Sequence, residues 1–346
     1  MATLKEIAQA AGVSMTTVSN VINGNKNRVS ADTVARIQHL IDQMGYVPNQ
    51  AARSLAQRGS QIVAVIVQAY DGENIFRNPY TAEYVGALTV ELYRNGYYPL
   101  IRFTDDFSDV EKDLRGWNVA GAIFNGSFSR HLQQIKSMTT VPCVFTDCYF
   151  CISGVNHVGV DDEGGGRMAG DYLARMGHRR VAFVANCIEE SDVDQHRLAG
   201  FRSGLAAHGI QLEEQGVLSI PMAQFNLKQS LPLRELLQCD DPPTAFFCTS
   251  DRVAVLLVQV LTQMHYRIPE DISVLGFDNL PLAEMCHPQL TTLAQDINQK
   301  AHLVVGMLVR HIQCKTLAPE RTLLGVSLVE RDSVRCLEKT AEHAMR

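Results

Sequence analysis

The sequence lacks long apolar runs and paired cysteines. No segment of its 346 residues is long and apolar enough to span a membrane. Its first residues, MATLKEIAQAAG, are interrupted by charge, unlike the apolar core of a secretory signal peptide. The nine cysteines are odd in number and scattered, mostly in apolar settings such as the VPCVF segment around Cys143. We therefore expect a cytoplasmic protein with reduced, buried thiols and no contact with a membrane.

Catalytic and metal-binding motifs are missing as well. The sequence has no GxSxG, no HExxH and no glycine-rich loop that ends in GK[ST], and its eleven histidines are dispersed. His178 in MGHRR fits the end of a helix better than a catalytic base. Cys148 and Cys151 form a CxxC, which could be a redox pair or half of a metal site. No second CxxC accompanies it, so we interpret the pair as ordinary loop cysteines and expect no enzyme, cofactor or metal.

One glycine run invites a different interpretation. Gly164, Gly166 and Gly170 form a GxGxxxG directly after a strand-like run, which could indicate a dinucleotide-binding loop. Three acidic residues precede the glycines and would repel a pyrophosphate, and the run is not a GxGxxG. The acids instead favour the N-terminus of a helix.

Charge is distributed unevenly along the chain. The net charge is −6, but residues 1–60 sum to +3 and the remainder to −9. A small basic head on an acidic body suits a polyanionic partner for the head, although a solvated charged face is the alternative. With 46% hydrophobic residues, the chain is long enough for two or three domains.

The head reads as three short helices. Thr3 and Glu6 form a capping box, and Leu4, Ile7, Ala8 and Ala11 give one apolar stripe that Gly12 ends. Ser14 begins a second helix over about 15–22, and Ser30 begins a third that Gly45 closes.

Two short helices joined by a tight glycine turn and packed on a third match helix-turn-helix geometry. The second helix buries valines at helical spacing and exposes hydroxyls and an amide within GVSMTTVSNVING. A small three-helix bundle used for protein contacts is the alternative. The hydroxyls, the absence of Glu/Lys ladders and the basic charge favour DNA.

The body alternates strand-like and helix-like runs. IVAVIV, YYPLIRF, VAGAIF, VPCVFT, HVGV, RRVAFVA, TAFFC, ISVLGF and LTTLA are separated by amphipathic stretches such as TAEYVGALTVELYRNG. This alternation predicts parallel sheets covered by helices on both faces. The span is long for one sheet, so we expect two doubly wound lobes with a ligand-binding cleft at the carboxyl ends of their strands.

The head resembles that of a known protein family. The run TLKEIAQAAGVSMTTVSNVING, followed by RVS and GYVPNQAARSL, is similar to the DNA-binding head of the lactose/galactose repressor (LacI) family. The resemblance implies base contacts in the major groove by Met15, Thr16, Asn20 and Arg28. It implies phosphate contacts by Ser14, Thr17, Ser19 and Asn23. It also implies a hinge helix in which Leu55, with Ala56, enters the minor groove; the alternative is a linker that rests on the body.

The body resembles the effector domain of the same family, which is similar to periplasmic sugar-binding proteins. The landmarks are VGVDDEGGGRMAGDYLARMGHRRVAFV, HRLAGF, PPTAFFCTSD, IPEDISVLGFDN and HPQLTTLAQD. The resemblance implies an effector pocket that contains Tyr80, Asp147, Arg197, Ser250, Asp251, Arg252 and Asp278. The alternatives are a surface ion pair for Arg197, a turn cap for Asp278 and helix caps for Ser250 and Asp251. The segment QAYDGENIFRNPY, within the loop at residues 68–80, is longer than usual; its Arg77, together with Arg252, suggests an anionic effector.

The resemblance implies a helix-turn-helix domain at 1–48, a hinge and linker at 49–60, a two-lobed effector and dimerisation domain at 61–331, and a tail at 332–346. The lobes should be joined by crossovers near 161, 292 and 322. The tail lacks leucine heptads, so we expect a homodimer without a tetramerising coiled coil. The predicted function is repression of carbohydrate-uptake or catabolic genes, through a pseudo-palindromic operator and a sugar-like effector. The alternative is a cytoplasmic sugar-binding or sugar-modifying protein whose head serves another partner.

Overall fold

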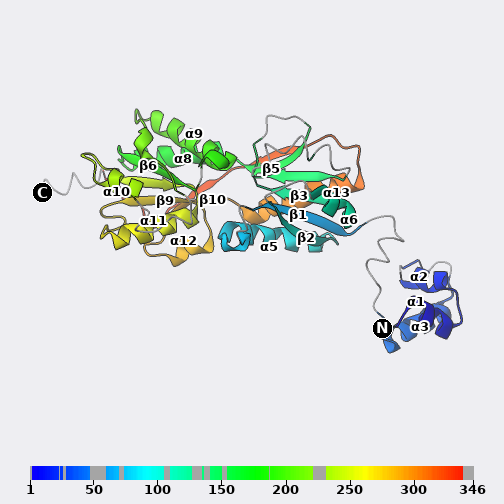
Figure 1. Ribbon diagram of the computed structural model, residues 1–346. Helices are drawn as coiled ribbons and strands as arrows, with labels where there is room; N and C mark the ends of the chain where they lie inside the picture. Colours follow the sequence, from blue (N-terminus) through cyan, green and yellow to red (C-terminus); the bar gives the residue numbers. More distant parts are fainter. Residues whose placement is uncertain are drawn as a thin grey trace. The chain divides into compact units, whose positions relative to one another are not determined.

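The computed structural model describes residues 2–22, 24–25, 29–46, 60–69, 74–104, 110–126, 135, 141–149, 154–186, 188–220 and 231–337. The chain divides into two units, Met1–Gln61 and Ile62–Arg346 (Figure 1). No helix in the described ranges is long and apolar enough to cross a membrane. In the same ranges, no group of three or more His, Cys, Asp or Glu side chains could hold a metal ion.

The head contains three helices, α1 (Leu4–Ala11), α2 (Met15–Ile22) and α3 (Ala31–Gln43). The capping box of α1 is present: the Glu6 amide donates to Thr3 Oγ1, and the Thr3 amide donates to the Glu6 carboxylate at 2.8 Å. Gly12 has a φ of 65°, the left-handed conformation that a glycine adopts without strain and that ends α1. These caps place α1, α2 and α3 where the sequence predicts them. Their apolar stripes meet in one core of Ile7, Ala8, Ala11, Val18, Val21 and Ile37.

The first lobe is a six-stranded sheet in the order β11-β5-β4-β3-β1-β2, and every neighbouring pair is parallel. Its strands are β1 (Ile62–Gln68), β2 (Tyr98–Thr104), β3 (Gly121–Asn125), β4 (Cys143–Thr146), β5 (Asn156–Val160) and β11 (Arg321–Leu324). Its helices are η2 (Ile75–Arg77), α5 (Pro79–Arg94), α6 (Val110–Gly116) and α13 (Ile297–Gln313). Strand β1 reads IVAVIVQ because both faces are covered: Val63, Val65 and Val67 pack in one core, and Ala64 and Ile66 in the other.

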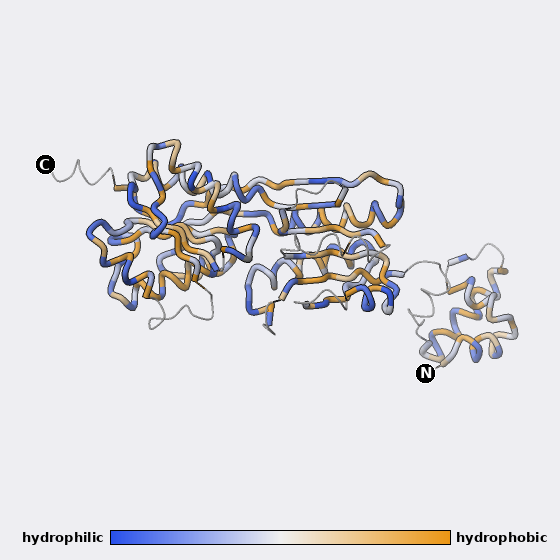
Figure 2. Tube along the Cα trace, turned by 45° about the horizontal axis from the view of Figure 1, so that its top comes forward, coloured by the Kyte–Doolittle hydropathy of each residue, from blue (hydrophilic) through white to orange (hydrophobic). Residues whose placement is uncertain are grey.

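The second lobe is a six-stranded sheet in the order β12-β10-β9-β8-β6-β7, parallel except for the antiparallel pair β10–β12. Its strands are β6 (Val181–Ala185), β7 (Val217–Ser219), β8 (Ala245–Cys248), β9 (Ser273–Asp278), β10 (Thr291–Ala294) and β12 (Ser327–Val329). Its helices are α8 (Asp162–Arg175), η4 (Ile188–Glu190), α9 (Asp192–Ala206), η5 (Glu214–Gly216), α10 (Leu231–Leu237), α11 (Asp251–Gln263) and α12 (Pro281–Met285). Figure 2 shows its apolar strands gathered between segments of mixed polarity. The predicted fold class, an all-α head and two doubly wound lobes, is confirmed.

The chain passes between the two sheets three times. It leaves the first sheet after Val160 and enters α8 at Asp162. It returns between Ala294 and Ile297, so that α13, drawn in orange, lies among the elements of the first lobe (Figure 1). It crosses a third time between Leu324 and Ser327. These crossovers compare with the expected positions near 161, 292 and 322.

The segment that follows Arg331 is partly built into the second lobe. The Ser333 hydroxyl donates to the carbonyl of Val274 at 2.6 Å and accepts from the amide of Thr291 at 2.8 Å. Val334 is buried in the core beneath α8 and α9. The first residues of the segment expected as a short tail, 332–346, thus contact the second lobe through Ser333 and Val334.

Helices α8 and α9 cross at unusually short range. A Cβ added at Gly200 would lie 1.9 Å from the carbonyl oxygen of Glu163, and one at Gly166 would lie 2.1 Å from that of Arg197. Gly170 and Gly204 face the opposite helix in the same way. Gly166 and Gly170 of the GxGxxxG run thus allow two helix backbones to touch. The contact fixes α9, and with it Arg197, against the start of α8.

Candidate functional sites

Helix α2 has a buried stripe of valines on one side and an exposed, mostly polar surface on the other. Val18 and Val21 are buried, whereas Met15 is 52% exposed and Thr16 is exposed. Asn20 is half-buried on the same helix. Because α2 is only two turns long and its apolar side is fixed by the core, these three side chains share the outward-facing part of its surface.

The hydroxyl residues at the start of α2 also shape the turn. Ser14 Oγ accepts a hydrogen bond from the Thr17 amide at 3.1 Å and lies 2.9 Å from Thr17 Oγ1. Ser14 therefore caps α2, and Ser14 and Thr17 both stand at the helix N-terminus, where backbone amides favour an anion. Ser19 is half-buried on the next turn. The expected contacts of Asn23, Arg28, Leu55 and Ala56 lie outside the described residues.

In the body, polar residues gather at the carboxyl ends of strands in both lobes. In the first lobe, Asp147 follows β4; in the second, Ser250 follows β8, Asp278 ends β9 and Gln295 follows β10. In doubly wound sheets these ends are where ligands bind. The φ angles of Asp147 and Asp278, 56° and 116°, are conformations that side-chain-bearing residues adopt rarely. Such strain concentrates at functional positions.

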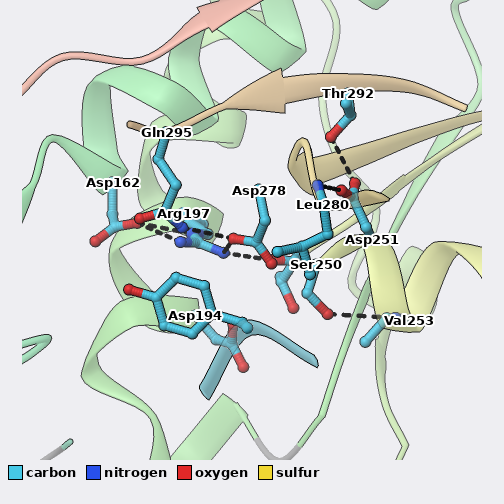
Figure 3. A network of polar contacts seen from close by, with 12 residues as sticks. Asp162, Asp194, Arg197, Ser250, Asp251, Val253, Asp278, Leu280, Thr292 and Gln295 are labelled. Atoms are coloured by element: carbon cyan, nitrogen blue, oxygen red, sulfur yellow. Dashed lines mark hydrogen bonds and ion pairs between the residues drawn. The ribbon is translucent and has the colours of Figure 1, made fainter. Parts of the chain in front are cut away.

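Arg197 is the centre of the cluster in the second lobe. Its Nε and Nη2 each lie 2.7 Å from Asp162 Oδ1, and its Nη1 donates to the Thr249 carbonyl. The guanidinium carbon lies 3.5 Å from the centre of the Phe277 ring, and Nη1 is 3.9 Å from Asp278 Oδ1. Figure 3 shows Asp162, Arg197 and Asp278 in a row with Gln295 beside them. Arg197 is buried, so the alternative of a surface ion pair does not describe it.

Two carboxylates near Arg197, those of Asp278 and Asp194, have raised pKa values. Burial raises the pKa of Asp278 well above its ordinary range, although Arg197 opposes the shift. Burial likewise raises the pKa of Asp194, at the start of α9, to about 6. Arg197 therefore does not fully offset the loss of hydration at these two carboxylates.

The expected residues of TSDR separate into different roles. Ser250 caps α11, since its Oγ accepts from the Val253 amide at 3.2 Å. Asp251 is fully buried; its Oδ2 accepts from the Leu280 amide at 2.7 Å and its Oδ1 from the Thr292 hydroxyl at 2.5 Å (Figure 3). Asp251 thus ties α11 to β10 and to the start of α12. Arg252 is half-buried on α11.

A second cluster belongs to the first lobe. The Tyr80 hydroxyl donates to Asp147 Oδ2 at 3.2 Å, and Lys300 Nζ donates to the Tyr80 hydroxyl at 2.7 Å and to Asp147 Oδ1. Lys300 is fully buried, and its Nζ lies 4.9 Å from the centre of the Tyr84 ring. Burial, and after it Asp147, raises the pKa of Tyr80 well above its ordinary value; Asp278 of the second lobe raises it slightly more and Arg197 lowers it, so the charges of one cluster act on the other.

The structure therefore brings together Arg197 with Asp278, and Tyr80 with Asp147. It adds four residues that the sequence did not single out as site residues: Asp162, Asp194, Gln295 and Lys300. Asp162 and Asp194 could be anticipated as acids in the first turn of a helix, and Gln295 as part of LTTLAQD. Lys300 had no signal, because a lysine in INQKAHLVVG is typical of an exposed helix surface. The idea that the CxxC is a redox pair loses support at Cys148, which is buried and whose thiol pKa burial raises. Cys151 lies outside the described residues.

Comparison with known proteins places both parts of the chain. Residues 3–49 match the model of bacterial regulatory proteins of the lacI family, and residues 171–334 match a periplasmic binding protein-like domain. The regulator CelR of Thermobifida fusca is 31% identical over 340 residues, which cover 96% of this chain and 98% of CelR.

Two solved structures span nearly the same length. The lac repressor dimer bound to operator and the anti-inducer ONPF has a TM-score of 0.84 at 25% identity, and covers 96% of this chain and 99% of its own. A complex of the regulator CelR with cellobiose has a TM-score of 0.71 at 29% identity, and covers 96% and 100%. Both similarities extend over the head and the two lobes together.

Proposed function

The chain belongs to the lacI family of bacterial regulatory proteins, and from this premise we propose that it is a cytoplasmic, sequence-specific transcriptional repressor controlled by a sugar-like effector. The observation that carries the proposal is the surface of α2, which buries Val18 and Val21 and leaves Met15 and Thr16 exposed at the start of the helix. A helix of this size fits the major groove, where its N-terminal residues reach base edges. Relatives are named as regulators and repressors rather than enzymes.

On the DNA side, we propose that Met15, Thr16 and Asn20 read bases and that Arg28 adds a contact. Asn20 can pair bidentately with adenine, Thr16 can bond several bases, and Met15 suits a thymine methyl. Ser14, Thr17, Ser19 and Asn23 would bind phosphates, and Leu55 with Ala56 would enter the minor groove. A homodimer would present two such heads to the half-sites of a pseudo-palindromic operator, as the lac repressor dimer binds its operator.

On the effector side, we propose that the ligand binds at the carboxyl ends of both sheets. Arg197 and Asp278 would hold it from the second lobe, and Tyr80 and Asp147 from the first. Ser250 and Arg252 would lie at the rim of the site, while the hydrogen bonds of Asp251 favour a supporting role. The support from relatives is the CelR–cellobiose complex. Unequal affinity of the effector for two arrangements of the lobes would change operator affinity, and the linkage is reciprocal.

The test compares the full chain with a protein that begins at Gln61, since the head is a separate unit. The full chain should bind a defined operator, and the shortened protein should keep its ligand affinity but lose DNA binding. If the shortened protein bound the same operator equally well, the head would not be the DNA-reading part. If the full chain bound no defined sequence, the alternative of a sugar-binding protein with another partner would be favoured.

A further inference from the structure

The charges at the carboxyl ends of the two sheets do not balance. Among the described residues, four carboxylates occupy the two clusters, those of Asp147, Asp162, Asp194 and Asp278. The cations that pair with them are Arg197 and Lys300. Asp251, buried beside Asp278, adds a further carboxylate, and the nearby Arg331 is paired with Glu284 at 2.9 Å.

Each of the two cations is already engaged by one carboxylate. Lys300 Nζ binds Asp147 Oδ1, and two nitrogens of Arg197 lie 2.7 Å from Asp162 Oδ1. The third nitrogen of Arg197 donates to a backbone carbonyl and stands 3.9 Å from Asp278. Asp278 therefore lies 3.9 Å from a cation that is already paired, and Asp194 relies on the same cation and on hydrogen bonds with Thr249 and Ser191. Buried carboxylates are stable only when a positive charge or a set of hydrogen-bond donors replaces the lost water.

Gln295 supplies a separate observation at the same place. Its side chain is 8% exposed, and its Nε2 donates to Asp278 Oδ1 at 2.6 Å. The amide nitrogen therefore faces Asp278, and Oε1 is the other polar atom of the Gln295 side chain. That oxygen is buried and has no hydrogen-bond partner among the described residues. A buried amide oxygen without a donor is unusual and indicates a missing donor.

From this arrangement we infer that the effector presents a protonated amine to Asp278, within reach of Gln295 and Asp194. The ligand class is therefore small polyhydroxylated amines, of which amino sugars are the simplest. An ammonium group has three donors and a positive charge, so it can bind both the Asp278 carboxylate and the orphan oxygen of Gln295. The inference rests on the proposed effector function and specifies its ligand.

The same geometry disfavours the anionic effector suggested by Arg77 and Arg252. Arg77 is exposed at the end of η2, and Arg252 is half-buried. Around Asp278, carboxylates outnumber the one guanidinium of Arg197, so a ligand carboxylate or phosphate placed there would meet like charge.

The experiment uses matched ligands and the full-length protein. Glucose, galactose and mannose are each compared with the 2-amino-2-deoxy sugar and its N-acetyl derivative, at a pH at which the amine is protonated. Binding is measured by isothermal titration calorimetry. At least one amine should bind about tenfold more tightly than its hydroxyl parent, because a charge-assisted bond replaces a neutral one. The N-acetyl sugar, which has lost the charge, should not share the gain.

Variants locate the effect. Asp278→Asn keeps the size of the side chain and removes the charge, so the amine and its parent should bind equally; Asp194→Asn should reduce the preference. The control is Asp171→Asn on α8 of the same lobe, which removes a half-buried carboxylate paired with Arg175 and bonded to His208 and should leave the preference unchanged. The inference is overturned if no amine binds more tightly than its parent, or if Asp278→Asn retains the preference. The proposed DNA-binding function is tested separately, by selecting from random DNA the sequences that the same protein preparation binds.

Discussion

Gly200→Ala tests how the crossing of α8 and α9 supports the effector cluster. The added Cβ would lie 1.9 Å from the Glu163 carbonyl oxygen and 2.8 Å from the Arg167 amide nitrogen, and both are backbone atoms that cannot turn aside. Restoring ordinary contact requires the helices to separate locally by about 1.5 Å. Overpacking of this kind costs about 1–3 kcal/mol or more, and alanine regains about 1 kcal/mol in helix propensity. We expect the free energy of unfolding to fall by about 2 kcal/mol.

The variant should also weaken effector binding, since Arg197 lies one turn before Gly200 on α9 and its nitrogens stand 2.7 Å from Asp162. Calorimetric unfolding and ligand titration measure the two effects. Gly306→Ala on α13 is the matched control: its nearest atom would be 3.7 Å away, at the end of the Arg310 side chain. That change should stabilise the protein by up to about 1 kcal/mol. If Gly200→Ala were as harmless as Gly306→Ala, the close crossing of α8 and α9 would not be needed for stability or for effector binding.

Three further predictions concern other parts of the chain. Asn20→Ala should shift operator preference, because an Asn–adenine pair contributes about 1–3 kcal/mol of discrimination. Thr17→Ala should instead weaken binding to all operators alike. Selection from random DNA measures both, and unchanged preferences in both variants would mean that another face reads the bases. Lys300→Met should lower the free energy of unfolding in urea by up to about 3 kcal/mol, because it leaves the half-buried Asp147 carboxylate without its cation. Adding Asp147→Asn should recover part of the loss, and an additive double variant would argue against the pair. Burial lowers the pKa of His178 from 6.5 to about 4, so between those pH values the unfolded chain binds a proton that the folded chain does not. The free energy of unfolding therefore decreases by up to about 3 kcal/mol as the pH is lowered from 6.5 to 4. His178→Gln should flatten that part of the pH profile of unfolding, and an unchanged slope would contradict the assignment.

Much of the fold can be predicted because local chemistry decides it. Thr3, Gly12 and Ser30 begin or end helices through hydrogen bonds and φ angles that depend on a few neighbouring residues. The run IVAVIV predicts a strand covered on both faces, and β1 is such a strand. The exact crossovers were less predictable, because where β10 and β11 end depends on pairing with strands distant in sequence.

The site is less visible in the sequence because its residues act through distant partners. Lys300 has the spacing of a surface lysine and is buried only because Asp147, more than 150 positions away, lies against it. His178 does lie just after the end of a helix, as predicted, but its ring is buried between Thr244 and the carbonyl of Arg335. In the sequence, the glycines of α8 resemble a phosphate-binding loop. Only the structure shows the contact with α9 that explains them.

Selection of bound sequences from random DNA by the full-length protein tests the central claim most directly. We predict a pseudo-palindromic site in which each half depends on Asn20, and whose enrichment changes when the protein's effector is present. Enrichment of no defined sequence, or of a site that is unaffected by Asn20→Ala and retained by a protein beginning at Gln61, would contradict the proposal that the head reads DNA.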